Sequence, residues 1–277
     1  MSFNSVNTNR QAVFALQSLN QTNSELSGVQ KRVSTGYRVA DAKDDGGAFA
    51  VAQAVRSDVA GVTAVGEQLG GVKGVLQTTF AALSTVSDTM KQVRATLTRL
   101  ADGAINGDQR AQYETQYTLL ATQISDFIDD ATYNGRTLLS TDVALGGGNI
   151  TGIRNEGGGT FQVQAVDGAD LKLALTPPAT AVLAQGQIAA GGTFDLIDGE
   201  ISTALNGFGA SMQYVENQIT YNAKKVDAMN DGLGALVDAD LAKESSKLQA
   251  LQTRQQLGIQ TLGIANQGPQ VLLSLFR

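Results

Sequence analysis

A long row of apolar residues in the first half of the chain limits the possible folds more than any other feature. It runs in alternating steps of three and four residues, and eleven of its twelve positions are apolar. This spacing places the row on one face of a single helix about 58 Å long, at 1.5 Å per residue. A helix cannot bury such a face alone, so the row predicts partner helices along its whole length. The positions are Val62, Val65, Leu69, Val72, Leu76, Thr79, Leu83, Val86, Met90, Val93, Leu97 and Leu100.

Two further helices are predicted as partners. A row from Ile201 to Leu233 has nine apolar residues in ten positions: Ile201, Leu205, Phe208, Met212, Val215, Ile219, Asn222, Val226, Met229 and Leu233. A shorter apolar face follows the break at residues 106–108 and comprises Tyr113, Tyr117, Leu120, Ile124, Phe127 and Ile128. Only three prolines and 5 % aromatic residues occur in the chain, as suits long helices. The fold class predicted is mainly α, a long antiparallel bundle or coiled coil built by the N- and C-terminal parts.

Residues 140–195 change in character. They hold eleven glycines and the pair Pro177–Pro178. Apolar residues alternate with period two before Asp167–Gly168, at Phe161, Val163 and Ala165, and after it, at Leu171, Leu173 and Leu175. This pattern predicts a β-hairpin with its tight turn at Asp167–Gly168, within a small central β-rich insertion.

The pattern as a whole predicts three parts. Residues 1–40 and 237–277 form a terminal coiled-coil part, and residues 41–140 with 195–236 form the helical bundle. Residues 141–194 form the small β-rich insertion, which projects outward from the helical trunk.

Both ends of the chain are poor in charge and rich in Gln and Asn. Residues 11–30 contain one charged residue, Glu25, and residues 248–276 contain one, Arg254. The predicted row near the N-terminus is Ala12, Leu16, Leu19, Leu26 and Val33, with Asn23 and Gln30 at interior positions. Amides on an apolar row weaken a coiled coil, so these helices are expected to order when other copies surround them. The alternative is a weak coiled coil at the end of a monomer. The predicted assembly interface comprises Leu16, Leu19, Asn23, Leu26, Gln30, Val33, Leu248, Leu251, Gln255, Leu262, Asn266, Leu272, Leu275 and Phe276.

The composition argues against enzymatic chemistry. The chain has no His and no Cys, which excludes a Ser-His-Asp triad, a HExxH zinc site and a CxxC redox site. We therefore predict a protein that is not an enzyme and has no cofactor or metal. Residues 101–210 carry 13 acidic and 4 basic side chains, net −9, against −6 for the whole chain, so nucleic acid is not an expected partner. No apolar run approaches the roughly 20 residues of a membrane span, so membrane insertion is not expected either.

The segment RVSTGYRVADAKDDGGAFAV, residues 32–51, has the composition of an ion-binding loop. An EF-hand with Gly46 at its sixth position would place Lys43 at the third and Ala52 at the twelfth, where oxygen ligands are needed. No Gly-Lys-Ser/Thr follows the glycines, so it is no P-loop. A structural corner is predicted, in which glycines end one helix and aspartates cap the next. Its residues are Gly36, Asp41, Asp44, Asp45 and Gly46.

Three segments of the chain resemble bacterial flagellins. They are RVSTGYRVADAKDDGGAFAVAQAVRSDV near the N-terminus, TYNGRTLL at residues 132–139, and the final segment from DADLAKESSKLQ to the end. The resemblance covers about residues 1–140 and 195–277. It implies a subunit that polymerises with itself into the extracellular flagellar filament for swimming motility, with the terminal segments forming the inner tube.

The resemblance also implies partners. These are an export chaperone and the flagellar type III export apparatus, a filament cap protein, and hook-associated junction proteins. It further implies O-linked sugars on the insertion, without indicating which residues carry them. Two alternatives remain open at this point: a hook-associated junction protein, which forms a short ring, and a non-flagellar coiled-coil tether.

Overall fold

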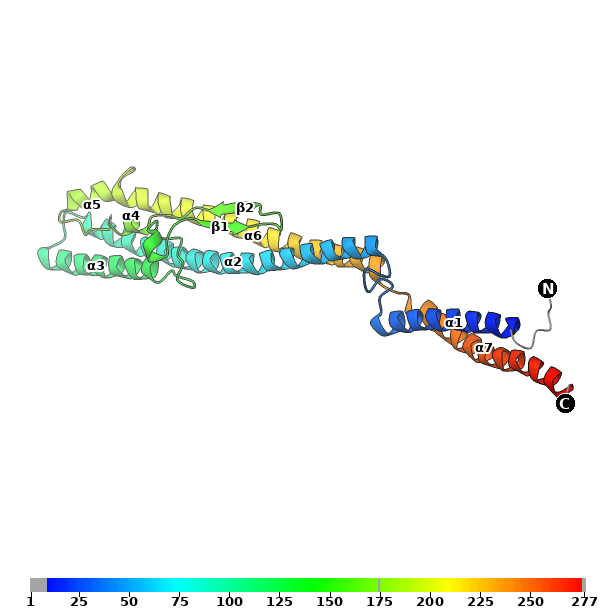
Figure 1. The fold of residues 1–277 in the computed structure, drawn as a ribbon. Helices are drawn as coiled ribbons and strands as arrows, with labels where there is room; N and C mark the ends of the chain where they lie inside the picture. The colour runs from blue at the N-terminus through cyan, green and yellow to red at the C-terminus, as the bar shows by residue number, and fades with distance from the viewer. Residues whose placement is uncertain (1–8, 174, 276–277) are drawn as a thin grey trace. The chain divides into compact units, whose positions relative to one another are not determined.

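The computed structural model describes residues 9–173 and 175–275; the side chains of residue 173 and of residues 268–275 fall outside this description. The described chain is mainly helical, with one small antiparallel sheet, as the sequence predicts (Figure 1). The elements are α1 (Arg10–Thr35), α2 (Gly46–Leu100), α3 (Gly107–Asp129), the 3₁₀ turn η1 (Val143–Leu145), β1 (Ile150–Ile153), β2 (Thr160–Val163), α4 (Gly168–Leu173), α5 (Ala181–Ile188), α6 (Thr193–Val237) and α7 (Leu241–Leu275).

The chain forms two compact units. The first comprises Met1–Ser57 and Ala228–Arg277, and the second comprises Asp58–Asp227. The first unit therefore contains α1, α7, the start of α2 and the end of α6. The second contains the rest of α2 and α6 together with α3 and the insertion. The division into three parts expected from the sequence remains a prediction.

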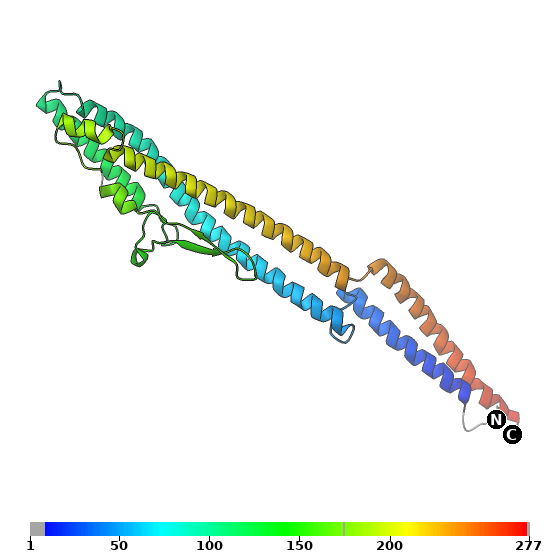
Figure 2. The same cartoon turned by 90° about the horizontal axis from the view of Figure 1, so that it is seen from above.

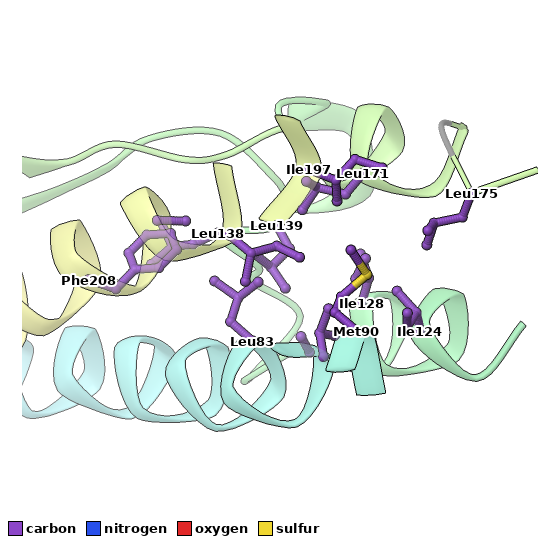
Figure 3. Packing of buried hydrophobic residues seen from close by; sticks show 14 of the residues in the cluster. Leu83, Met90, Ile124, Ile128, Leu138, Leu139, Leu171, Leu175, Ile197 and Phe208 are labelled. Atoms are coloured by element: carbon purple, nitrogen blue, oxygen red, sulfur yellow. The ribbon is translucent and has the colours of Figure 1, made fainter. Parts of the chain in front are cut away.

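The core of the second unit lies between α2, α3 and α6. All twelve positions of the predicted α2 row are buried except Val72, which is half-buried. From α3 come Tyr117, Leu120, Ile124 and Ile128, and from α6 come Ile201, Phe208 and Val215. Figure 3 shows Met90 of α2 beside Ile124 and Ile128 of α3, and Leu138 and Leu139 between Leu83 of α2 and helix α6. The predicted three-helix core is confirmed.

The break between α2 and α3 is built by local caps. Asn106 accepts a hydrogen bond from Gln109 N at 2.8 Å, and the Gln109 side chain accepts one from Asn106 N, which makes a capping box. Arg110 Nη2 donates to the Leu100 carbonyl oxygen at 2.8 Å, which satisfies a group at the end of α2. The predicted break at residues 106–108 is therefore where the chain turns.

A two-residue turn follows α3. Asn134 and Gly135 have φ of 50° and 70°, and Tyr133 and Arg136 exchange backbone hydrogen bonds of 2.9 and 3.0 Å. Positive φ at both central residues is the signature of a type I′ turn, for which Asn-Gly is the preferred pair. The turn directs the chain back so that Leu138 and Leu139 enter the core.

The insertion differs from the prediction. Its hairpin pairs β1 with β2 in antiparallel register, with Ile150 opposite Val163 and Ile153 opposite Thr160. The predicted strand after Asp167–Gly168 is wrong, because residues 168–173 form α4. Asp167 Oδ1 accepts from Ala169 N at 2.9 Å, so the Asp-Gly pair starts a helix instead of turning a hairpin. The short α5 adds further helix to a region expected to be β-rich.

Candidate assembly interface

Helices α1 and α7 of the first unit lie antiparallel, side by side in both views (Figures 1 and 2). Contacts run along the pair in reverse order. At one end Asn9 Nδ2 donates to the Ala265 carbonyl oxygen at 2.6 Å, and at the other Arg32 lies 3.5 Å from a Glu244 carboxylate oxygen. The pair is therefore held by polar contacts at both ends.

The pair buries only a narrow core. Leu26, Val29 and Leu251 form its buried cluster, with half-buried Val33 and Leu248 packed against them. This is a small apolar contact for two helices of 26 and 35 residues. Since most helical stability in proteins comes from tertiary packing, these helices depend on what else covers them.

The register of α1 differs from the predicted row. The structure turns Thr22 and Val29 toward α7, while Leu16, Asn23 and Gln30 are exposed. The interior positions expected for Asn23 and Gln30 are therefore wrong for the single chain. The reason is that α1 carries two rows with similar apolar content, and α7 presents Leu251 to the row containing Val29. Leu19, Leu26 and Val33 belong to the covered row as predicted.

Residues of α7 lie as follows. Leu251 is buried, Leu248, Gln255 and Leu262 are half-buried, and Asn266 is exposed. Gln255 Nε2 donates to Asn23 Oδ1 at 2.7 Å, so an amide pair crosses the edge of the contact. The side chains of Leu272 and Leu275, and the whole of Phe276, lie outside the described residues.

Apolar side chains remain uncovered on both helices. The exposed fractions of Phe14 and Ile264 are 69 % and 70 %, and further exposed members are Val13, Leu16, Leu241, Leu257 and Ile259. Sequence reasoning missed most of these, because they lie off the rows it followed. The sequence did contain a sign of most of these exposed residues, because they are apolar residues in two segments that carry almost no charge. Exposed apolar groups gathered on a thin helix pair indicate a protein interface.

The corner after α1 is fixed by glycine and by ion pairs. Gly36 ends the helix at φ 73°, with its N–H donating to the Arg32 carbonyl oxygen. Lys31 Nζ lies 2.7 Å from Asp41 Oδ2 and 2.9 Å from Asp44 Oδ2. These hydrogen bonds lower the pKa of both carboxyl groups and raise the pKa of Lys31. The Lys31 ammonium group thus neutralises two carboxylates of the corner.

The remaining corner residues begin α2. Asp45 Oδ1 accepts from Ala48 N at 3.0 Å, which caps the helix that starts at Gly46. Within residues 9–173 and 175–275, no group of three or more acidic side chains could hold a metal ion. The helices in the same ranges include none long and apolar enough to cross a membrane.

The two chain segments that connect the helices of the first unit are bonded to each other. Arg38 N donates to the Val237 carbonyl oxygen at 2.7 Å, and Ala239 N donates to the Gly36 carbonyl oxygen at 2.9 Å. Tyr37 and Asp238 form an antiparallel bridge between these segments. Beneath them Val39, Ala52 and Val237 form a small buried cluster. The corner therefore joins both connections into one bonded element.

Comparison with known proteins agrees with this architecture. Residues 6–144 match the bacterial flagellin N-terminal helical region, and residues 195–276 match the bacterial flagellin C-terminal helical region. The chain is 35 % identical to flagellin FljK of Caulobacter vibrioides over 277 residues, which cover all of both chains. It is 33 % identical to a flagellin of Brucella melitensis, with 99 % of each chain covered.

A solved structure shows a related fold. The crystal structure of Bacillus cereus flagellin matches with a TM-score of 0.52 at 21 % identity, covering 56 % of this chain and 88 % of that chain. Flagellin C of Rhizobium meliloti is a further relative, 30 % identical with 99 % of each chain covered. Two matching regions that flank the insertion, and relatives aligned over the full length, establish that the chain belongs to the bacterial flagellin family.

Proposed function

We propose that the chain polymerises with itself into the flagellar filament, through the uncovered faces of α1 and α7. The observation that carries this proposal is the exposed apolar and amide surface of the pair, above a core of only a few buried residues. Flagellins are structural proteins, and the role proposed for this chain is structural and not enzymatic.

The energetics favour assembly over a free coiled coil. Exposed residues such as Phe14 and Ile264 gain about 25 cal/mol for each Å² of apolar surface that a second copy covers. The surrounding amides can donate to and accept from neighbouring copies. Few charges have to be desolvated, since residues 11–30 hold only Glu25.

We propose that the interface residues predicted from the sequence contact neighbouring copies in the filament. Leu16, Asn23 and Gln30, exposed in the single chain, become contacts with neighbouring copies. Polymerisation outside the cell requires export, so we propose the flagellar type III apparatus and an export chaperone as partners. A cap protein and hook-associated junction proteins are the proposed partners at the two ends of the filament, and swimming motility follows from the polymer.

A truncation experiment tests the proposal. Deleting residues 1–30 or 245–277 should leave a soluble, largely helical monomer, because the core of the second unit is untouched. Such a monomer should fail to elongate sonicated filament seeds of the full-length chain, as followed by electron microscopy. Normal filaments from either truncation would refute the assembly role.

The same experiment separates the alternatives. A hook-associated junction protein would add a short ring to the seeds and then stop, whereas a filament subunit adds long tubes. A coiled-coil tether predicts a stable dimer with protease-resistant ends in dilute solution. Limited proteolysis that trims both ends of the free monomer would exclude the tether.

A further inference from the structure

The chain contains three Asn-Gly pairs, at residues 106–107, 134–135 and 206–207. In such a pair the backbone nitrogen of the glycine can attack the side-chain amide of the asparagine, because glycine has no Cβ to hinder the approach. All three asparagines are exposed, so contact with water does not distinguish them. The local structure around each pair differs, and it decides which pair can react in the folded chain.

The pair Asn206–Gly207 lies inside α6 and is protected. In a helix the Gly207 N–H is bonded to a carbonyl oxygen one turn back. The neighbouring residues Ala204 and Phe208 are buried in the core of the second unit. Attack at this pair requires α6 to open, and α6 can open here only when that core opens.

The pair Asn106–Gly107 begins α3, and its asparagine is held in place. Asn106 Oδ1 accepts a hydrogen bond from Gln109 N at 2.8 Å, and the Asn106 carbonyl oxygen accepts one from Arg110 N at 3.0 Å. The side-chain amide has to leave this capping position before the Gly107 nitrogen can reach its carbon. The capping box therefore slows attack at this pair without preventing it.

The pair Asn134–Gly135 is free of these restraints. It forms the centre of the two-residue turn after α3, outside any helix or strand. Neither the Asn134 side chain nor the Gly135 N–H has a hydrogen-bond partner among the described residues. The φ of 50° at Asn134 is a conformation that residues other than glycine adopt at a cost in free energy. Attack requires only the hydrogen bonds between exposed Tyr133 and Arg136 to open, and leaves the core intact.

We propose that Asn134 is a self-modification site, at which the folded chain converts its own asparagine without an enzyme. The Gly135 nitrogen loses its proton to solvent and forms a bond to Asn134 Cγ, while the Cγ–Nδ2 bond breaks and ammonia leaves. Water then opens the succinimide ring, on the Cγ side to give aspartate or on the backbone side to give isoaspartate. The net reaction consumes one water, releases one ammonia and adds one carboxylate, with no change in oxidation state.

The two products should affect the turn differently. Aspartate preserves it, because Asp-Gly also suits a type I′ turn. Isoaspartate routes the backbone through Cγ and so inserts a methylene group between Tyr133 and Arg136, whose two backbone hydrogen bonds of 2.9 and 3.0 Å depend on a turn of two residues. The segment that leads to buried Leu138 and Leu139 should therefore loosen as isoaspartate accumulates with the age of the subunit.

Peptide mass spectrometry of the full-length chain tests the proposal. Trypsin cleaves after lysine and arginine, which places the three pairs on three separate peptides, residues 100–110, 111–136 and 173–224. The chain is incubated in mildly alkaline buffer, folded in one sample and unfolded in concentrated urea in the other. The converted fraction of each peptide is followed with time, and fragmentation distinguishes aspartate from isoaspartate. The unfolded sample gives the reactivity of each pair without structure.

In urea the three pairs should react at similar rates. In the folded chain Asn134 should react about tenfold faster than Asn106, because the capping hydrogen bonds add to the barrier there. Asn206 should be slowed more than about a thousandfold relative to urea, since it waits for the core to open. Gln109→Ala removes the side-chain half of the capping box and should accelerate reaction at Asn106 while leaving Asn134 unchanged.

Thermal melts test the effect on the turn. Freshly purified Asn134→Asp should melt like fresh wild type, whereas aged wild type should melt at a temperature that falls as its isoaspartate content rises. A folded chain in which Asn134 reacts no faster than Asn106 would overturn the assignment of the site. Aged protein that carries isoaspartate at position 134 and still melts like fresh protein would overturn its effect on the turn. None of these measurements involves polymerisation, so their outcome is independent of the proposed function.

Discussion

The ring of Tyr133 lies directly over Gly74, where a Cβ would stand only 2.7 Å from Tyr133 Cζ. Tyr133 belongs to the Asn134–Gly135 turn, and Gly74 lies inside α2. A glycine inside a helix costs about 1 kcal/mol relative to alanine, so the contact with Tyr133 explains why this one is present.

Gly74→Ala should therefore destabilise the second unit by about 1–3 kcal/mol, because Tyr133 must move away. Gly70→Ala is the matched control, since no atom lies within 4 Å of a Cβ there. That change should stabilise the helix by about 0.5–1 kcal/mol. Urea unfolding followed by circular dichroism gives both values, and equal effects at the two glycines would contradict this account.

Thr79 is the one polar residue of the α2 row, and its hydroxyl is fully buried without a hydrogen-bond partner among the described residues. Thr79→Val keeps the shape and removes the unpaired group, so it should raise the free energy of unfolding by about 1–2 kcal/mol. Thr89→Val is the control, because the Thr89 hydroxyl donates to the Thr85 carbonyl oxygen at 2.9 Å. In thermal melts, Thr79→Val should have a higher melting temperature than wild type and Thr89→Val should not. A Thr79→Val protein less stable than wild type would disprove the prediction.

Asn222 interrupts the apolar row of α6 for an identifiable reason. Its Nδ2 donates to the Arg154 carbonyl oxygen at 3.3 Å, and Gln218 Nε2 donates to the same oxygen at 3.0 Å. Lys225 forms an ion pair with Glu156 beside them. These contacts hold the loop between β1 and β2 on α6.

Asn222→Ala should cost about 1–2 kcal/mol and accelerate hydrogen exchange in residues 150–163. Asn217→Ala removes the same side chain from an exposed position of the same helix and should change neither. Exchange mass spectrometry resolves this segment. Unchanged protection of the hairpin in Asn222→Ala would show that the amide does not hold it.

The corner after α1 should respond to acid. The pKa of Asp41 and of Asp44 lies below the ordinary value of 3.8, chiefly because both accept hydrogen bonds from Lys31. A lowered folded pKa means that this stabilisation is complete above about pH 4 and is lost as the pH falls through the folded value. The raised pKa of Lys31 likewise means that its contribution is lost only as the pH rises above 10.5.

Carboxyl carbon titration by NMR measures this directly. In Lys31→Met the titration midpoints of Asp41 and Asp44 should move up toward 3.8, whereas Lys43→Met should leave them in place. The amide of Ala40, which donates to Asp44 Oδ2 at 3.0 Å, should lose protection over the same pH range. Midpoints that do not change in Lys31→Met would remove lysine as the cause.

The long helices could be predicted from the sequence because strict three-and-four spacing that continues from Val62 to Leu100, or from Ile201 to Leu233, has one interpretation. The rows from Val62 and from Ile201 are therefore covered as expected, even though Thr79 and Asn222 interrupt them. In α1 two rows compete with similar apolar content. The choice between Val29 and Gln30 depends on Leu251, more than two hundred residues away, and local spacing cannot supply that information.

The hairpin shows the same limit on a smaller scale. Leu171 and Leu175 fit period two, but the structure places Leu171 in the short helix α4, which ends at Leu173, before Leu175. The structure buries both against the core, next to a Gly168 whose N–H donates to the Leu139 carbonyl oxygen at 3.1 Å.

The hydrogen bonds between the α1–α2 connection and the α6–α7 connection have a mechanical consequence. In a filament built from this chain, any load that passes between the α1–α7 pair and the rest of the subunit must cross the two connections at residues 36–40 and 236–239. Because these two segments are cross-linked by backbone hydrogen bonds, tension on one is shared by the other in shear. The two connections therefore bear load as one unit, and separating them requires their shared backbone hydrogen bonds to break together.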